Sequence, residues 1–169
     1  MTFQIGEKVV YFNRGIGTIE NISSRSFGSH FEKFYLLRLA TGRMTVMVPF
    51  SHAGASVLRK ITTNGEWERV LSFLSSGCCV CCRDWKNRFK ENTEKMRSGG
   101  PLQIAEVLKS LLLVQRQKPL SFREKKMLDC ARQMLTIELS IARGTEEAGA
   151  AGMIQRALSK AALELPRPL

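Results

Sequence analysis

The chain has 169 residues, a formal net charge of +11 at pH 7 and an isoelectric point near 9.9. This excess of cations favours a polyanionic partner such as nucleic acid, or an acidic protein surface, and charge alone does not choose between them. The longest apolar run, residues 111–114, is far too short to cross a bilayer, and the first residues lack the basic start and apolar core of a signal peptide. We therefore expect a cytoplasmic protein with no membrane partner.

Residues 1–61 have the pattern of short β-strands. Glycine-containing turns separate four extended segments: residues 8–12, 16–22, 32–40 and 44–48. Several short strands within about sixty residues are typical of a small, strongly bent barrel of the SH3 or Tudor kind. No catalytic constellation lies in this region, as is usual for a docking module.

The last extended segment alternates cleanly between its two faces. The alternation predicts Met44, Val46 and Val48 on one face of the strand and Thr45 and Met47 on the other. An exposed edge strand of this kind can pair with a strand of another protein.

From residue 62 the apolar period changes from two to 3.6 residues, which indicates helices. Capping signals, glycines and prolines divide this region into five helices, which begin near residues 64, 85, 101, 122 and 146. We expect the last one to continue until Pro166 and Pro168 stop it. The sequence thus predicts an α+β protein of two domains: a Tudor- or SH3-like β-barrel over residues 1–61, followed by a compact all-helical domain over residues 62–169.

The helix predicted over residues 85–98 is strongly basic. Asp84 is a good N-cap, so Trp85 falls on the first turn, while Lys86 and Lys90 share one stripe. A duplex-binding protein needs cations for phosphates and can use an apolar wedge at a base step. The same pattern also fits a core tryptophan beside a solvated lysine face, and it leaves both interpretations open.

Four cysteines lie close together: Cys78, Cys79, Cys81 and Cys82. Their overlapping C-x-x-C spacings could hold zinc or form a redox pair. The ligand set is incomplete, because Cys130 lies alone and His30 and His52 lie in another part of the chain, so a reduced linker is favoured. The sequence has no phosphate-binding glycine loop and no catalytic triad pattern. We therefore predict no enzyme activity, no metal or other cofactor, and no small-molecule substrate.

Several segments resemble the CarD/CdnL family of bacterial transcription regulators. They follow one another in the family's order over nearly the whole chain, at residues 5–11, 15–17, 35–38, 44–49, 84–92, 95–99 and 120–128. The first half of that family also resembles the RNA polymerase-interacting module of the transcription-repair coupling factor. Family members often carry a basic residue where Met47 stands, and the cysteine cluster is not part of the family pattern.

The resemblance implies a transcription regulator that docks on the RNA polymerase β subunit and stabilises the open promoter complex at the upstream edge of the bubble. The implied polymerase contacts are Arg25, on a loop after the second strand, and the strand residues Met44, Thr45, Val46, Met47 and Val48. The implied contacts with promoter DNA are Trp85, as a minor-groove wedge, with Lys86, Arg88, Lys90, Lys125 and Lys126. The alternative is an RNA polymerase or protein-binding adaptor in which Trp85 is buried.

Overall fold

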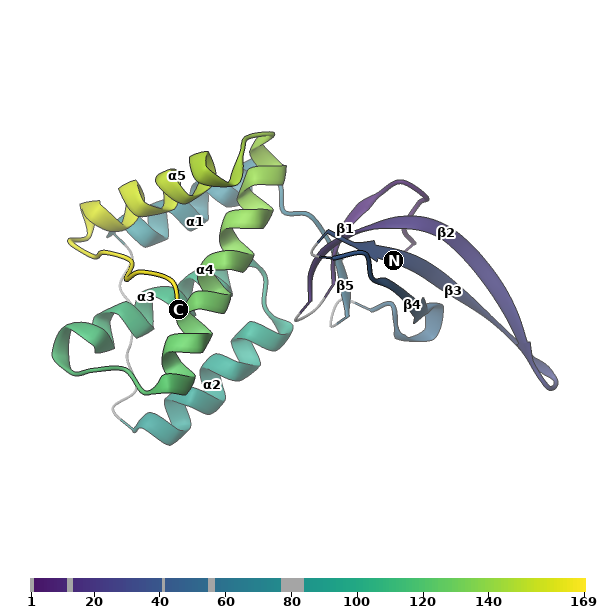
Figure 1. Cartoon of the computed structure of the whole chain (residues 1–169), viewed down its shortest axis with the longest axis horizontal. Coiled ribbons are helices and arrows are strands. Elements are labelled where there is room, and N and C mark those ends of the chain that lie inside the picture. Colours follow the sequence, from purple (N-terminus) through teal and green to yellow (C-terminus); the bar gives the residue numbers. More distant parts are fainter. Residues whose placement is uncertain (1, 12–13, 41, 55–56, 77–83) are drawn as a thin grey trace. The chain divides into compact units, whose positions relative to one another are not determined.

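The computed structural model describes residues 2–11, 14–40, 42–54, 57–76 and 84–169. The chain forms two compact units, Met1–Ile61 and Thr62–Leu169 (Figure 1). Their arrangement confirms the predicted α+β class, with an antiparallel sheet of Tudor-like type followed by a helical region. Among the described residues, no helix combines the length and apolar character that a bilayer crossing requires.

The first unit is built on one antiparallel sheet with the strand order β4-β3-β2-β1-β5. Its strands are β1 (Lys8–Tyr11), β2 (Gly15–Phe27), β3 (His30–Leu39), β4 (Thr45–Pro49) and β5 (Leu58–Lys60), and the short 3-10 helix η1 (Phe50–His52) follows β4. The strand β5 was not predicted, because three residues are too few for a clear alternation. The strand β2 runs five residues beyond the predicted end at residue 22.

The core of the sheet lies around Tyr35, which is almost completely buried. Its ring stacks on Phe50 with the centroids 4.0 Å apart, and its hydroxyl accepts a hydrogen bond from the Phe3 N–H at 3.2 Å. Gly17 is required here, because a Cβ at this position would lie 2.8 Å from Leu37 Cγ. These contacts pack η1 and the N-terminal segment against β3, and Gly17 lets β2 approach Leu37 closely.

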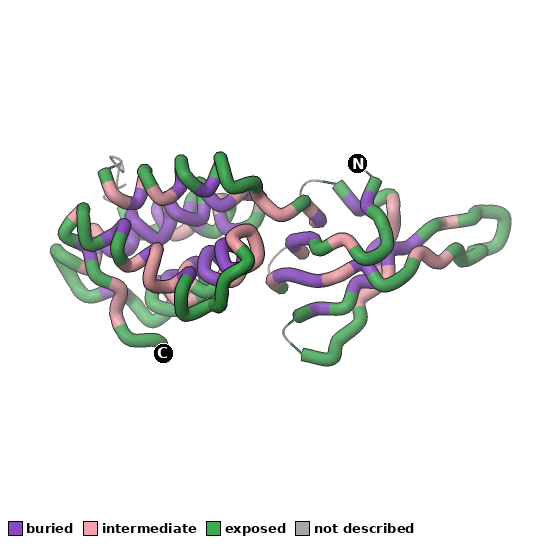
Figure 2. Tube along the Cα trace, turned by 90° about the horizontal axis from the view of Figure 1, so that it is seen from above, coloured by how far each residue is buried: buried purple, intermediate pink, exposed green. Residues whose placement is uncertain are grey.

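The outer half of the β2–β3 ribbon extends beyond this core. Residues near its turn are exposed, among them Phe27 and Phe31, and Figure 2 shows this end of the ribbon as an exposed hairpin. Arg25 lies within this ribbon and is paired with Glu32. The expectation that Arg25 lies on a loop is therefore wrong, because continued strand pairing extends β2 past it.

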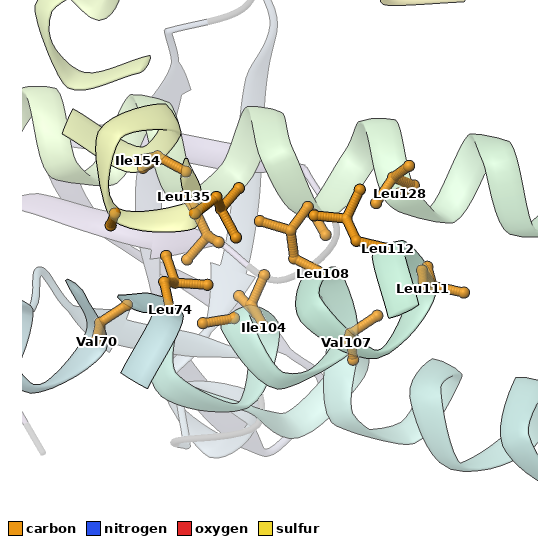
Figure 3. Packing of buried hydrophobic residues seen from close by; sticks show 14 of the residues in the cluster. Val70, Leu74, Ile104, Val107, Leu108, Leu111, Leu112, Leu128, Leu135 and Ile154 are labelled. Atoms are coloured by element: carbon orange, nitrogen blue, oxygen red, sulfur yellow. The ribbon is translucent and has the colours of Figure 1, made fainter. Parts of the chain in front are cut away.

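The described part of the second unit contains five helices. They are α1 (Asn64–Ser76), α2 (Trp85–Ser98), α3 (Pro101–Gln117), α4 (Phe122–Arg143) and α5 (Glu147–Lys160). Figure 3 shows Leu74, Leu108, Leu135 and Ile154 converging from α1, α3, α4 and α5, and all four side chains are fully buried. Trp67 of α1 belongs to the same cluster.

The last helix ends earlier than its prolines suggested. A turn at residues 161–162 follows Lys160, with Ala162 at φ +55°, and the Leu163 N–H donates to the Leu158 carbonyl at 3.0 Å. Leu163 is buried against the helical core. The helix therefore ends in a turn that buries this apolar side chain, before the chain reaches Pro166.

The connection between the two units is short. Lys60 ends β5, and the Thr62 N–H already donates to Glu138 Oε1 on α4 at 3.0 Å. Glu138 is itself buried. Only Ile61 therefore lies between the sheet and the first anchored residue of the helical unit.

Candidate nucleic-acid interface and docking edge

The start of α2 presents Trp85 to solvent. Asp84 caps the helix, with its Oδ1 accepting the Lys86 N–H at 3.2 Å, and this cap places Trp85 on the first helical position. The Trp85 side chain is 53% exposed, and Lys86 Nζ lies 6.0 Å from its ring centroid. The interpretation of Trp85 as a core residue is therefore wrong, and Trp67 is the tryptophan of the core.

The start of α4 has a similar construction. Ser121 and Glu124 form the predicted capping box, in which Ser121 Oγ accepts the Glu124 N–H and Glu124 Oε2 accepts the Ser121 N–H at 3.0 Å. Phe122 follows the cap and is 65% exposed, and Lys126 Nζ lies 5.0 Å from its ring centroid. Lys125 is exposed beside it.

A buried ion pair joins these two helix starts. Arg88 Nη2 donates to Glu124 Oε1 at 2.6 Å, and the side chains are only 4% and 7% exposed. Burial disfavours the charged carboxylate, but the hydrogen bonds from Arg88 and Ser121 outweigh it, and the pKa of Glu124 is lowered from its usual value. The pair therefore holds α2 against α4 with both groups charged.

This pairing changes the role expected for Arg88. The resemblance implies a DNA contact for Arg88, whereas the structure places its guanidinium in the interior, where Nη2 donates to Glu124. A buried charge requires such a partner. Arg88 therefore joins the starts of α2 and α4 and does not present its guanidinium at the surface.

The remaining predicted cations lie on the surface, at one end of the helical unit. Figure 1 shows α2 and α4 beginning near each other, and the Arg88 contact joins them there. The exposed side chains around the two starts include Lys86, Lys90, Arg123, Lys125 and Lys126. Helix N-termini carry partial positive charge, which adds to that of the lysines. The arrangement suits phosphate groups next to a flat aromatic ring.

Sequence reasoning missed the exposed Phe122. A signal was present, because Phe122 does not share the helical stripe of the buried residues Leu128, Ala131 and Leu135. The capping box at Ser121 predicts where the helix begins, but it carries no information on whether the next side chain is exposed.

The strand β4 is an edge of the sheet, and in the described residues it pairs only with β3. The Leu39 N–H donates to the Met44 carbonyl at 3.0 Å, so the alternating ladder turns the backbone groups of Val46 and Val48 towards β3. The backbone N–H and C=O groups of Thr45 and Met47 consequently face the open edge. This edge can accept a further strand.

The side chains of this segment divide in the same way. Val48 is buried and Val46 packs against the core, whereas Met44 and Thr45 are exposed and Met47 is half-buried. Val46 and Val48 are therefore unsuited to contact a partner directly, since both their side chains and their backbone groups are used within the sheet. Their contribution is to hold Thr45 and Met47 in place.

The cysteine cluster Cys78, Cys79, Cys81 and Cys82 lies outside the described residues. Within those residues, no three His, Cys, Asp or Glu side chains gather in a way that could hold a metal ion. Cys130 is exposed on α4 as a free thiol.

Two family models match the chain, and the boundary between them lies near the boundary between the two compact units. The family model described as the CarD-like/TRCF RID domain matches residues 3–62, and the model described as the CarD C-terminal domain matches residues 69–155. The chain is also 34% identical over 145 residues to the putative transcription factor YdeB of Bacillus subtilis (strain 168). That alignment covers 86% of this chain and 95% of the relative.

Proposed function

This chain belongs to the CarD/CdnL family of bacterial transcription regulators, and on that premise we propose that it stabilises open promoter complexes while docked on RNA polymerase. Edge strand β4 pairs with a strand of the β subunit, and the starts of α2 and α4 contact promoter DNA at the upstream edge of the bubble. The observation that carries the proposal is the exposed Trp85 on the first position of a basic helix.

The proposed action needs no chemical energy. Promoter opening is an equilibrium, and a factor that binds the open form more tightly than the closed form shifts it by the difference in affinity. A tryptophan that enters only a distorted minor groove supplies that difference. Lysine contacts with phosphates, by contrast, occur on open and closed DNA alike and mainly add affinity.

The proposed docking uses the open edge of β4. Thr45 and Met47 together offer two N–H donors and two carbonyl acceptors to an incoming strand. Pro49 lacks an N–H and ends the strand, so the paired stretch is short. Arg25, on the ribbon of β2 and β3, adds a cation for an acidic surface of the partner.

The wedge is tested by the lifetime of open complexes formed by bacterial RNA polymerase with no addition, with this protein and with its Trp85→Ala variant. We expect the protein to lengthen the lifetime and Trp85→Ala to lose that effect while still binding polymerase. Leu102→Ala is the matched control, because Leu102 is an exposed apolar side chain of the same unit beyond the far end of α2. If Trp85→Ala acts like Leu102→Ala, the protein is a polymerase adaptor without a wedge.

The docking edge is tested with two proline substitutions in β4. Met47→Pro removes an N–H that faces the open edge, so we expect weaker binding to the β subunit and little loss of stability. Val46→Pro removes an N–H that faces β3 and is expected to destabilise the sheet. Wild-type polymerase binding by a folded Met47→Pro variant would contradict the strand-pairing model.

A further inference from the structure

We infer that Phe122 is a second base-stacking residue, which holds an unpaired base of the melted strand. The inference rests on the proposed function and extends it to a residue that neither family resemblance nor charge pattern singled out. Its ligand is a nucleobase exposed by strand separation, rather than a base pair.

The folded chain gains little from this phenylalanine ring. Phe122 is 65% exposed, and the helix start depends instead on the Ser121–Glu124 capping box and on the buried Leu120 that precedes it. Exposing a large ring leaves its burial energy unused. The ring is therefore available to a partner.

The charges around Phe122 select the partner. The other exposed side chains of the first turns are Arg123, Lys125 and Lys126, while the one acid of the first turn, Glu124, is buried against Arg88. Lys126 Nζ lies 5.0 Å from the ring centroid, which places a cation beside an aromatic face. Cations interleaved with an aromatic platform are the combination that binds single-stranded nucleic acid.

The geometry favours an unpaired base over a duplex. A base inside a duplex is stacked on both faces, so a ring on a helix start can stack only on a base whose neighbour has been removed. The Arg88–Glu124 contact joins the starts of α2 and α4, so the exposed rings of Trp85 and Phe122 belong to the same end of the helical unit. Phe122 comes two residues before Glu124, so its ring points to the side of α4 that faces away from this contact. Where Trp85 enters the edge of a bubble, Phe122 at the same end of the helical unit reaches the separated strand.

The first test compares binding to two DNA probes of equal length and charge, a fully paired duplex and a fork whose two arms stay unpaired because they are not complementary. Fluorescence anisotropy at low salt with the full chain should show Phe122→Ala about tenfold weaker on the fork and nearly unchanged on the duplex. Phe122→Leu keeps an apolar side chain without a π-system and should resemble Phe122→Ala, whereas Phe122→Tyr should restore fork binding. Equal losses on both probes, or full binding by Phe122→Leu, would overturn the inference.

The second test places 2-aminopurine at successive unpaired positions of a pre-melted promoter bubble bound by RNA polymerase. Stacking quenches this base, so the wild-type chain should quench one position and Phe122→Ala should release it. Because the bubble is already open, this result does not depend on whether the protein prolongs open complexes. If Trp85→Ala shortens the lifetime while Phe122→Ala leaves quenching unchanged, the proposed function stands and the stacking inference fails. If Phe122→Ala instead abolishes polymerase binding, the residue is a protein contact and the inference also fails.

Discussion

Replacing Arg88 by methionine should destabilise the helical unit strongly. The substitution keeps much of the side-chain volume and removes the cation that neutralises Glu124 at 2.6 Å. Removing one partner of a buried ion pair costs about 3–5 kcal/mol, because the other charge stays buried without compensation. This is a large fraction of the roughly 5–15 kcal/mol that stabilises a whole domain.

Urea unfolding followed by the helical far-UV circular dichroism signal measures this loss. The double variant Arg88→Met/Glu124→Leu should recover at least half of it, because neither buried charge remains, although the capping box with Ser121 is lost as well. If Arg88→Met lowers the free energy of unfolding by less than about 1 kcal/mol, the reasoning is refuted, because a loss that small is typical of substitutions at exposed side chains.

The same variant separates a buried residue that joins two helices from a phosphate contact. Lys90→Met is the matched control, because Lys90 lies two residues further along α2 and is exposed. We expect Lys90→Met to lower the salt dependence of DNA binding by about one unit of slope, and Arg88→Met to leave that slope unchanged where it is still folded. A lowered slope together with unchanged stability would return Arg88 to the DNA surface.

Three further predictions concern charge and exposure. Because folding lowers the pKa of Glu124, its contribution to the free energy of unfolding should be complete above the ordinary glutamate pKa of about 4.3 and be lost as the pH falls through the lower folded-state pKa. When urea midpoints are measured against pH, Glu124→Gln should therefore show a smaller loss of stability at acid pH than the wild type. Lys125→Glu should weaken binding to DNA of any sequence and reduce its salt dependence, in anisotropy titrations over a range of salt, and unchanged affinity would exclude this contact. In a Trp67→Phe background the remaining Trp85 should emit at long wavelength and be readily quenched by acrylamide, whereas a blue-shifted, protected emission would contradict its exposure.

Local patterns were sufficient for most of the helical unit. The caps at Asp84 and Ser121 are sequence signals that act over three residues, and both helices begin where these signals indicate. The start of α2 at Trp85 follows from its cap alone. Whether the tryptophan is exposed does not follow from the cap, because the pattern also fits a core ring, and only the tertiary packing, which buries Trp67 and leaves Trp85 out of the core cluster, decides it.

The role of Arg88 was beyond local reasoning. Its partner Glu124 lies 36 residues away, and no spacing in the sequence pairs a cation on one helix with a capping acid on another. The loop position expected for Arg25 was wrong and β5 was missed for a related reason, because the length of a strand and the formation of a short strand depend on the neighbouring strand with which it pairs. The sequence thus predicted which residues are cationic, and the fold decided which of those cations reach the surface.

The single residue between the two units has a consequence for weak binding. A short covalent connection turns the second of two binding events into an intramolecular one, with an effective local concentration that reaches the millimolar range for short linkers. Ile61 alone separates β5 from the anchored Thr62, so under the proposed function, docking of the sheet on polymerase would raise the local concentration of the α2 and α4 starts at the DNA. Under that proposal, a DNA affinity too weak to hold the free protein on a promoter would be sufficient, and the chain would leave random duplex easily while staying where both surfaces are engaged.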